Sequence, residues 1–354
     1  MKTQVLKNGT KIIIFLLIFM LMFSILNRFF NPSGTMKEWF QSNAMLEFYR
    51  ERKESIDVIY VGNSCIYSAV SPMEIYEKIG ITGYSISSPK QKIWSSYYMI
   101  KEVLKYQKPK LIFIEVGEVF YGKNTNDELS TRKAIDTLKL SKNKIDMVND
   151  NDYNMSNFEK LGCIFPIIRY HSRWSSVDEY DFRKFIFDGN YTEKGFLLEK
   201  EKRSYKGRFS NKIQNEIIED YNLEEELDKI PNECEKKVDE IINLCKENNI
   251  ELVLIKFPEP KVWNEEKHNI IKEFAYQKEI KFVDLNYEEK INIDWETDTQ
   301  DGGDHLNIYG AEKVAQYLAD FIKNNYELQD HRNDKNYADW NEDLKKYKIY
   351  KNRR

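Results

Sequence analysis

The chain is poor in cysteine, glycine and proline. Its 354 residues include 4 cysteines, 14 glycines and 8 prolines. The cysteines show no Cys-x-x-Cys spacing, which argues against a zinc site and against a disulfide framework. Cys234 and Cys245 fall in one predicted helix, roughly 16 Å apart along its axis, too far to bridge. We therefore expect neither a structural metal nor a disulfide.

A strong charge of one sign is also missing. The 54 Lys and Arg residues nearly balance the 58 Asp and Glu residues, for a net charge of −4. A general nucleic-acid binder would usually be basic, so we expect no nucleic-acid partner. No Gly-rich phosphate loop and no convincing metal-ligand spacing occur, so we expect no cofactor. Aromatic residues are abundant; Trp174 and Trp263 favour core packing, with stacking on sugar rings as the alternative.

One long apolar run stands near the N-terminus. Residues 12–26 are apolar apart from Ser24, with lysines before them, Arg28 after them and further aromatics up to residue 30. A cleaved signal peptide is the alternative, but no small-x-small cleavage site follows. We expect an uncleaved single-pass anchor that contacts the lipid bilayer through residues 12–30. The lysines before it predict a cytoplasmic N-terminus and an extracytoplasmic remainder.

Strands alternate with helices along the rest of the chain. Apolar β-branched runs between turn residues predict strands, and apolar residues at helical spacing predict helices. The predicted strands are 56–61, 81–86, 111–116, 251–257 and 281–285, and the predicted helices are 72–78, 94–106, 232–248, 262–277 and 309–324. This alternation is typical of βαβ units, so we expect an α/β fold with a central parallel sheet.

The alternation of strands and helices, with the segments that lack it, predicts four parts of the chain. They are an N-terminus and anchor (1–30), a linker (31–54), a domain (55–325) and a C-terminal tail (326–354) that either packs or frays. Residues 117–230 break the alternation and form an insertion, which we expect to cap the ligand site because it follows the carboxyl end of a strand.

Ser64 and His305 are the candidate catalytic pair. Ser64 follows a predicted buried strand that ends at Gly62, where open α/β sheets place their ligands. A serine hydroxyl needs a base to become a nucleophile, and His305 supplies an imidazole late in the chain. Cys65 is a rival nucleophile, but one position further along turns it away, and a buried cysteine is usually inert.

The two ends of this pattern resemble a known family. The segment Gly62-Asn63-Ser64 and the segment from Asp301 through His305-Leu306-Asn307 are similar to the SGNH/GDSL hydrolase superfamily. They look most like its membrane-anchored bacterial branch, similar to the teichoic-acid D-alanylation protein DltD and to polysaccharide O-acetyltransferases. The resemblance covers residues 56 to about 325. It implies a flavodoxin-like three-layer sandwich with a large insertion.

The chain departs from the family pattern at the acid and at the oxyanion donors. The usual acid position, three before the histidine, holds Gly302 here. We favour Asp301 as the acid because the glycines let the chain loop back, and keep Asp304 as the alternative. The backbone N–H of Ser64 is the expected oxyanion donor. The loop carrying Ser88 and Gln91 supplies the remaining donors by analogy with the family.

Other histidines and arginines have weaker signals. His171 and Arg173, in the insertion, are candidate ligands for an anionic or sugar substrate, although Arg173 pairing with a carboxylate is an equal alternative. His268 and His331 lie in a charged helix and in the tail, and we expect both at the surface.

The resemblance implies acyl transfer through an acyl-Ser64 on a cell-envelope polysaccharide or teichoic acid. A membrane-bound O-acyltransferase is the implied donor partner. Two alternatives stay open at this point: a carbohydrate esterase or deacetylase with the same triad, and a non-catalytic domain that binds glycan or a partner.

Overall fold

A five-stranded parallel sheet forms the centre of the protein. The computed structural model describes residues 2–31, 40–125, 127–177, 182, 193–203, 229–287 and 291–353. The strand order is β2-β1-β3-β4-β5, and neighbouring strands run parallel. The strands are β1 (Val58–Gly62), β2 (Gly83–Ser87), β3 (Leu111–Glu115), β4 (Glu251–Lys256) and β5 (Lys281–Asp284). This is the flavodoxin-like order, so the predicted fold class is confirmed.

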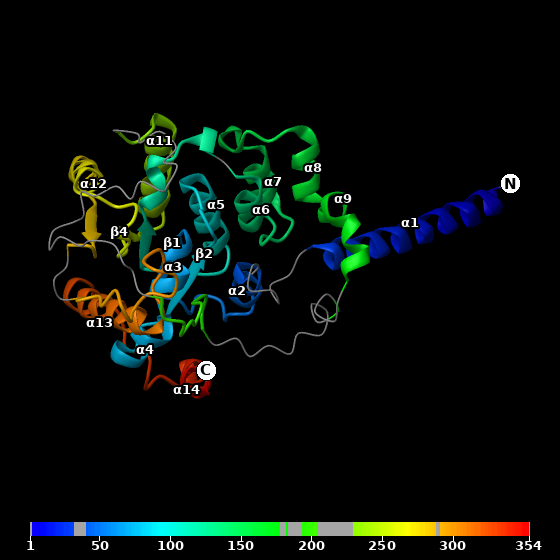
Figure 1. The fold of residues 1–354 in the computed structure, drawn as a ribbon. Coiled ribbons are helices and arrows are strands. Elements are labelled where there is room, and N and C mark those ends of the chain that lie inside the picture. Colours follow the sequence, from blue (N-terminus) through cyan, green and yellow to red (C-terminus); the bar gives the residue numbers. More distant parts are fainter. Residues whose placement is uncertain are drawn as a thin grey trace.

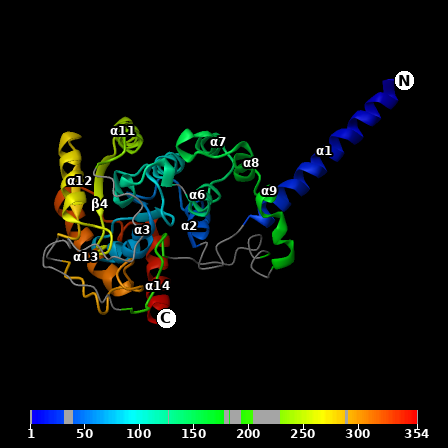
Figure 2. The same ribbon diagram turned by 45° about the horizontal axis from the view of Figure 1, so that its top comes forward.

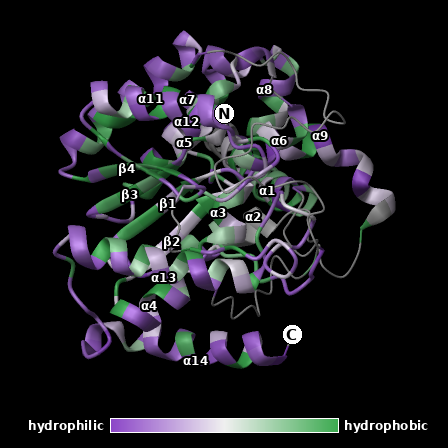
Figure 3. Ribbon diagram, turned by 60° about the vertical axis from the view of Figure 1, so that its left-hand side comes forward, coloured by the Kyte–Doolittle hydropathy of each residue, from purple (hydrophilic) through white to green (hydrophobic). Residues whose placement is uncertain are grey.

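Helices cover both faces of the sheet (Figure 1). Alternate side chains of β1 enter different apolar clusters: Val58 and Tyr60 pack with α3, α4 and α13, whereas Ile59 and Val61 pack with α5, α11 and α12. Because both faces are buried, the strands are continuously apolar rather than alternating. Figure 3 shows them as mostly hydrophobic ribbons between helices with hydrophilic outer faces.

The helices have the following bounds. Before β4 they are α1 (Lys2–Phe30), α2 (Phe40–Phe48), α3 (Ser64–Ala69), α4 (Pro72–Ile79), α5 (Ile93–Val103), α6 (Glu128–Ile135), α7 (Lys142–Asn149), α8 (Asn157–Ile164), α9 (Pro166–Tyr170) and α11 (Asn232–Glu247). After β4 they are α12 (Glu265–Gln277), α13 (Ile308–Asn325) and α14 (Ala338–Arg353). Short 3₁₀ turns are η2 (Gly117–Phe120), η3 (Lys123–Thr125), η4 (Asn151–Tyr153), η5 (His171–Ser176) and η6 (Lys335–Tyr337).

The two ends of the chain behave differently. Helix α1 projects from the body (Figures 1 and 2), and its segment Asn8–Phe30 is long and apolar enough to cross a membrane. The tail packs rather than frays. Trp340 and Tyr347 of α14 are fully buried, and the Tyr347 hydroxyl lies 3.0 Å from that of Ser71.

The described part of the insertion does not form a simple cap. Helices α6 to α9 lie beside α5 and reach the base of α1 (Figure 1), away from the carboxyl edge of the sheet. Residues 193–203 do approach that edge: Leu197 N donates to Tyr67 O (2.7 Å), and Ile308 N donates to Glu199 O (2.8 Å). Much of the predicted cap, including 204–228, lies outside the described residues.

Candidate active site

Ser64 lies where β1 turns into α3. Gly62 ends the strand, and a Cβ there would lie 2.5 Å from Glu115 Cβ, so no larger residue fits. Asn63 caps α3, because its Oδ1 accepts a hydrogen bond from Cys65 N at 3.0 Å. Ser64, the first residue of the helix, is partly exposed. It stands at the carboxyl edge between β1 and β3, the point at which the strand order reverses.

The loop before α13 presents His305. Thr299 pairs with Leu306 in an antiparallel bridge, and Thr299 Oγ1 donates to His305 O at 2.9 Å. Gly302 (φ +80°) and Gly303 (φ +105°) adopt left-handed backbone that favours glycine. These two residues turn the chain back on itself.

Asp301 is the carboxylate that meets the imidazole. Its Oδ2 lies 2.5 Å from His305 Nδ1, and its Oδ1 accepts a hydrogen bond from His305 N at 2.8 Å. Asp304 points elsewhere and bonds to Lys261 Nζ at 2.7 Å. The geometry therefore places Asp301, rather than Asp304, in the orienting position.

The pair changes both pKa values. Burial alone lowers the pKa of His305, but the hydrogen bond to Asp301 and the charges of Asp301, Glu259 and Asp304 outweigh it, so the net shift is upward. Burial raises the pKa of Asp301, and the His305 contacts and backbone donors outweigh it, so the net shift is downward. The imidazolium is thus stabilised, as a general base in this position requires.

Tyr67 adjoins both the serine and the histidine, and sequence reasoning did not single it out. It lies three residues after Ser64 in α3, so both side chains share one helix face. Its phenol adjoins the Ser64 side chain, and its ring is parallel to the His305 ring at a centroid distance of 6.3 Å. Burial raises the pKa of Tyr67, so the phenol stays neutral. The i, i+3 spacing from the candidate nucleophile was the available signal.

A buried ionic group lies under this edge of the sheet. Lys256 Nζ bonds Glu115 Oε1 at 2.9 Å and also contacts Glu259, and the Lys256 and Glu115 side chains are fully buried. The carboxylates raise the pKa of Lys256, which therefore stays charged. Since Glu259 also raises the pKa of His305, the group links the end of β4 to the imidazole.

The expected oxyanion loop adjoins the serine but uses its side chains internally. Ser88 N donates to Gly62 O at 3.4 Å, which places the loop beside the end of β1. Ser88 Oγ donates to Gln91 Oε1 at 3.0 Å, and Gln91 Nε2 donates to Ser96 Oγ at 3.1 Å. Both side chains are buried, so they brace the loop.

Cys65 is unsuited to nucleophilic attack. Its side chain is buried, and burial raises the pKa of the thiol well above its usual value. Since the thiolate is the reactive form, the thiol is inert where it lies.

His171 and Arg173 are not brought to this edge. They lie in η5, beside the base of α1, where Arg173 Nη1 donates to Phe30 O at 3.0 Å. Figures 1 and 2 both show this part of the insertion next to α1, away from α3.

Two further expectations are wrong. His331 is buried rather than at the surface, because it bonds Asp57 at 2.8 Å across the base of the sheet. Trp174 is 73% exposed rather than in the core. Trp263 is buried as expected, with its Nε1 donating to Asp284 at 2.6 Å. His268, which bonds the same carboxylate at 2.8 Å, is only partly exposed.

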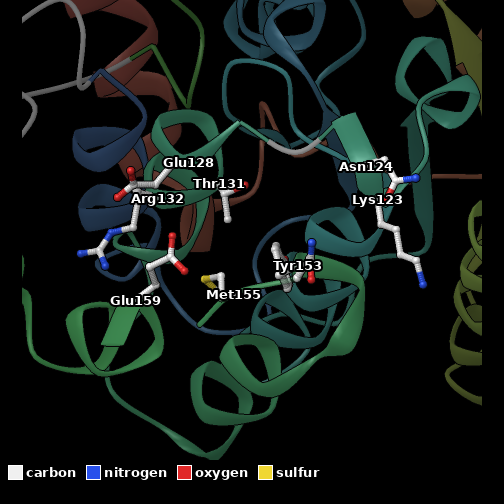
Figure 4. A pocket seen from close by; sticks show the side chains of 9 residues that line it. Lys123, Asn124, Glu128, Thr131, Arg132, Tyr153, Met155 and Glu159 are labelled. Atoms are coloured by element: carbon white, nitrogen blue, oxygen red, sulfur yellow. The ribbon is translucent and has the colours of Figure 1, made fainter. Parts of the chain in front are cut away.

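Three cavities lined by described residues lie away from Ser64. Figure 4 shows one of about 150 Å³ within the insertion, where Arg132, Glu128 and Glu159 surround the opening with Tyr153 and Met155. Across the described ranges, no group of three or more His, Cys, Asp or Glu side chains has metal-binding geometry.

Comparisons with known proteins leave the family open. No family model matches the chain, and no curated protein matches it. Among solved structures it is similar to a proposed acylhydrolase from Bacteroides fragilis, with a TM-score of 0.37 and 13% identity over 79% of this chain and 94% of that one. It is also similar to a GDSL-like lipase from Bacteroides thetaiotaomicron, with a TM-score of 0.36 and 12% identity over 80% of this chain and 98% of that one. Likeness at this level carries no argument about activity, so the functional conclusion rests on the residues themselves.

Proposed function

We propose that the protein is a serine-dependent acyltransferase that works through a covalent acyl-Ser64. The observation that carries the proposal is the Asp301–His305 pair, whose imidazole stacks on Tyr67, one turn after Ser64 in α3 at the carboxyl edge of the sheet. A hydroxyl, an imidazole and an orienting carboxylate are the groups that acyl transfer needs.

Each residue has a defined role in the proposed reaction. His305 Nε2 takes the Ser64 proton as the oxygen attacks the acyl carbonyl, and Asp301 stabilises the imidazolium through Nδ1. The Ser64 N–H, which has no intrahelical acceptor at the first position of α3, donates to the oxyanion. When the tetrahedral intermediate collapses, the leaving group departs with the proton that His305 returns to it. An acceptor hydroxyl then loses its proton to His305 and attacks the acyl-serine.

The proposed acceptor is a cell-envelope polysaccharide or teichoic acid. An apolar N-terminal helix that serves as an anchor would hold the domain beside such a polymer, on the outer face of the membrane. A membrane-bound O-acyltransferase would then be within reach as acyl donor. With water as acceptor the same residues would act as an esterase, which is the second candidate because the His305 and Asp301 side chains are 27% and 34% exposed to solvent.

The test follows the acyl group. The full-length protein in detergent is given an isotopically labelled acetyl ester, with and without oligosaccharide acceptors of envelope type, and a Ser64→Ala variant is the control. Labelled acetyl-oligosaccharide formed by the wild type alone supports transfer, and labelled acetate alone supports the esterase. Equal rates in wild type and variant would contradict the proposal in both forms.

A further inference from the structure

The insertion touches α1 inside its apolar span. The Phe165 ring meets the Phe23 ring edge-on at 5.5 Å, and Ile167 N donates to Asn27 Oδ1 at 3.0 Å. Arg173 adds its contact with the carbonyl of Phe30. Phe23, Asn27 and Phe30 follow an i, i+4, i+7 spacing. The insertion therefore contacts one face of α1 over two helical turns.

The position of these contacts along α1 determines how deep they would lie in a bilayer that α1 spans. The apolar segment Asn8–Phe30 has 23 residues. At about 1.5 Å per residue it is roughly 34 Å long, close to the ~30 Å hydrocarbon core of a bilayer. Phe23 lies roughly 10 Å before the end of that segment by the same rise. If α1 spans a membrane, the corner between α8 and α9 must lie at the boundary of the outer leaflet.

The side chains at the corner between α8 and α9 are of the kinds found at a membrane–water boundary. Phe158 is 67% exposed, Leu161 is 47% exposed, and with Phe165 they follow an i, i+3, i+7 spacing that continues toward α1. Trp174 of η5 is 73% exposed, and tryptophan is enriched at membrane–water interfaces. Lys160 of α8 suits anionic headgroups, whereas Arg169 of α9 pairs with Glu128 at 3.0 Å.

We propose that α8, α9 and η5 form a second membrane contact, here called the interfacial foot, which lies on the outer leaflet beside α1. The foot inserts Phe158, Leu161 and Trp174 at headgroup level, as interfacial helices do to a depth of roughly 5–10 Å. One spanning helix leaves a domain free to tilt and rotate, whereas a second contact fixes its orientation. This places the Ser64 edge at one height over the bilayer. The proposal requires α1 to be a membrane span, but it is independent of the acyl chemistry.

The continuity of the apolar stripe with α1 favours lipid over a protein partner. The stripe starts at a contact already inside the span and runs outward along α8, and Lys160 beside it complements anionic lipid. His171 and Arg173, predicted as substrate ligands, then lie at headgroup level rather than at the catalytic edge.

Site-directed fluorescence in vesicles tests the foot without measuring activity. The four native cysteines are buried, so a new surface thiol can be labelled selectively. Leu161→Cys and Trp174→Cys, each carrying a nitrobenzoxadiazole label, are placed in the full-length chain and reconstituted into phosphatidylcholine and phosphatidylglycerol vesicles. Ile18→Cys in α1 is the lipid control, and Tyr276→Cys in α12, where the native residue is 80% exposed, is the water control.

We expect the labels at 161 and 174 to shift to the blue, to be quenched by nitroxide-bearing lipids and to be protected from iodide, as the label at 18 is. The label at 276 should show the opposite response. Iodide quenching at 161 and 174 equal to that at 276 would overturn the proposal. Protection from both quenchers would also overturn it, since the patch would then be covered by protein. A label at 18 that behaves like the one at 276 would instead remove the premise that α1 spans the bilayer.

Discussion

The two ends of strand β1 each carry a histidine–aspartate pair, with different consequences. At the amino end, His331 Nε2 lies 2.8 Å from Asp57 Oδ2, the ring stacks on Tyr337 at 3.7 Å, and His331 is only 4% exposed. At the carboxyl end, the His305 side chain is 27% exposed. The first pair ties the C-terminal segment to the sheet, whereas the second leaves its imidazole partly accessible next to Tyr67 of α3. The two short contacts are alike, so the proposed catalytic role of the second pair rests on its place at the carboxyl edge of the sheet.

Replacing the two histidines separates these roles most strongly. His305→Ala removes the base, so kcat for an activated acetyl ester should fall by about 10⁶-fold. His331→Ala leaves the carboxyl edge intact and should keep the wild-type kcat per folded molecule. Steady-state kinetics on both variants, with circular dichroism to establish folding, checks this. Equal losses in the two would break the distinction between the two ends.

The two aspartates beside His305 give the next largest contrast. Asp301→Asn should lower kcat by about 10⁴-fold, because the imidazole loses its orienting charge. Activity requires neutral His305 and so rises with pH through its pKa. Since Asp301 raises that pKa, the rising limb of the pH–rate profile should lie at lower pH in the Asp301→Asn variant than in the wild type.

Asp304→Asn is the matched control. It removes the contact with Lys261 and a minor contribution to the raised pKa of His305, but not the carboxylate that bonds the imidazole, so kcat should stay near the wild-type value. A larger loss in Asp304→Asn than in Asp301→Asn, measured from the same pH–rate profiles, would reverse the assignment of the acid.

At the amino end the expected effect is on stability. Asp57→Asn weakens the bond to His331, and Thr82 Oγ1, which donates to the same carboxylate at 3.0 Å, must adjust too. The free energy of unfolding should fall by about 1–3 kcal/mol. Urea denaturation measures it, and kcat at low denaturant should not change. An unchanged midpoint would mean that the pair does not hold the tail.

Tyr67→Phe should have the smallest effect. The ring next to His305 remains, and only the phenol hydroxyl beside Ser64 is lost, so kcat should fall by about tenfold at most, with KM unchanged. Kinetics with the activated ester provide the measurement. If kcat is instead unaffected, Tyr67 only packs beside the serine.

Features that depend on local sequence could be predicted. The strand ends, the helix after Ser64 and the loop-back at Gly302 and Gly303 all follow from neighbours in the chain. The helix predicted over 262–277 begins later, at Glu265, because Asn264 Oδ1 caps it by accepting from Lys267 N.

Features that depend on distant contacts could not be predicted. His331 looked like a surface residue of a charged tail because nothing local reveals Asp57, which lies 274 positions away. The insertion was expected over the site, but its helices contact α1 through Phe165 and Ile167. Neither partner can be inferred from spacing alone.

A fluorophosphonate probe tests the central claim most directly, since it reacts with an activated serine. The full-length wild type, His305→Ala and His331→Ala are each treated with the probe, digested and analysed by mass spectrometry. The account predicts stoichiometric labelling at Ser64 in the wild type and in His331→Ala, and none in His305→Ala. An unlabelled Ser64 in folded wild type, or undiminished labelling in His305→Ala, would contradict it.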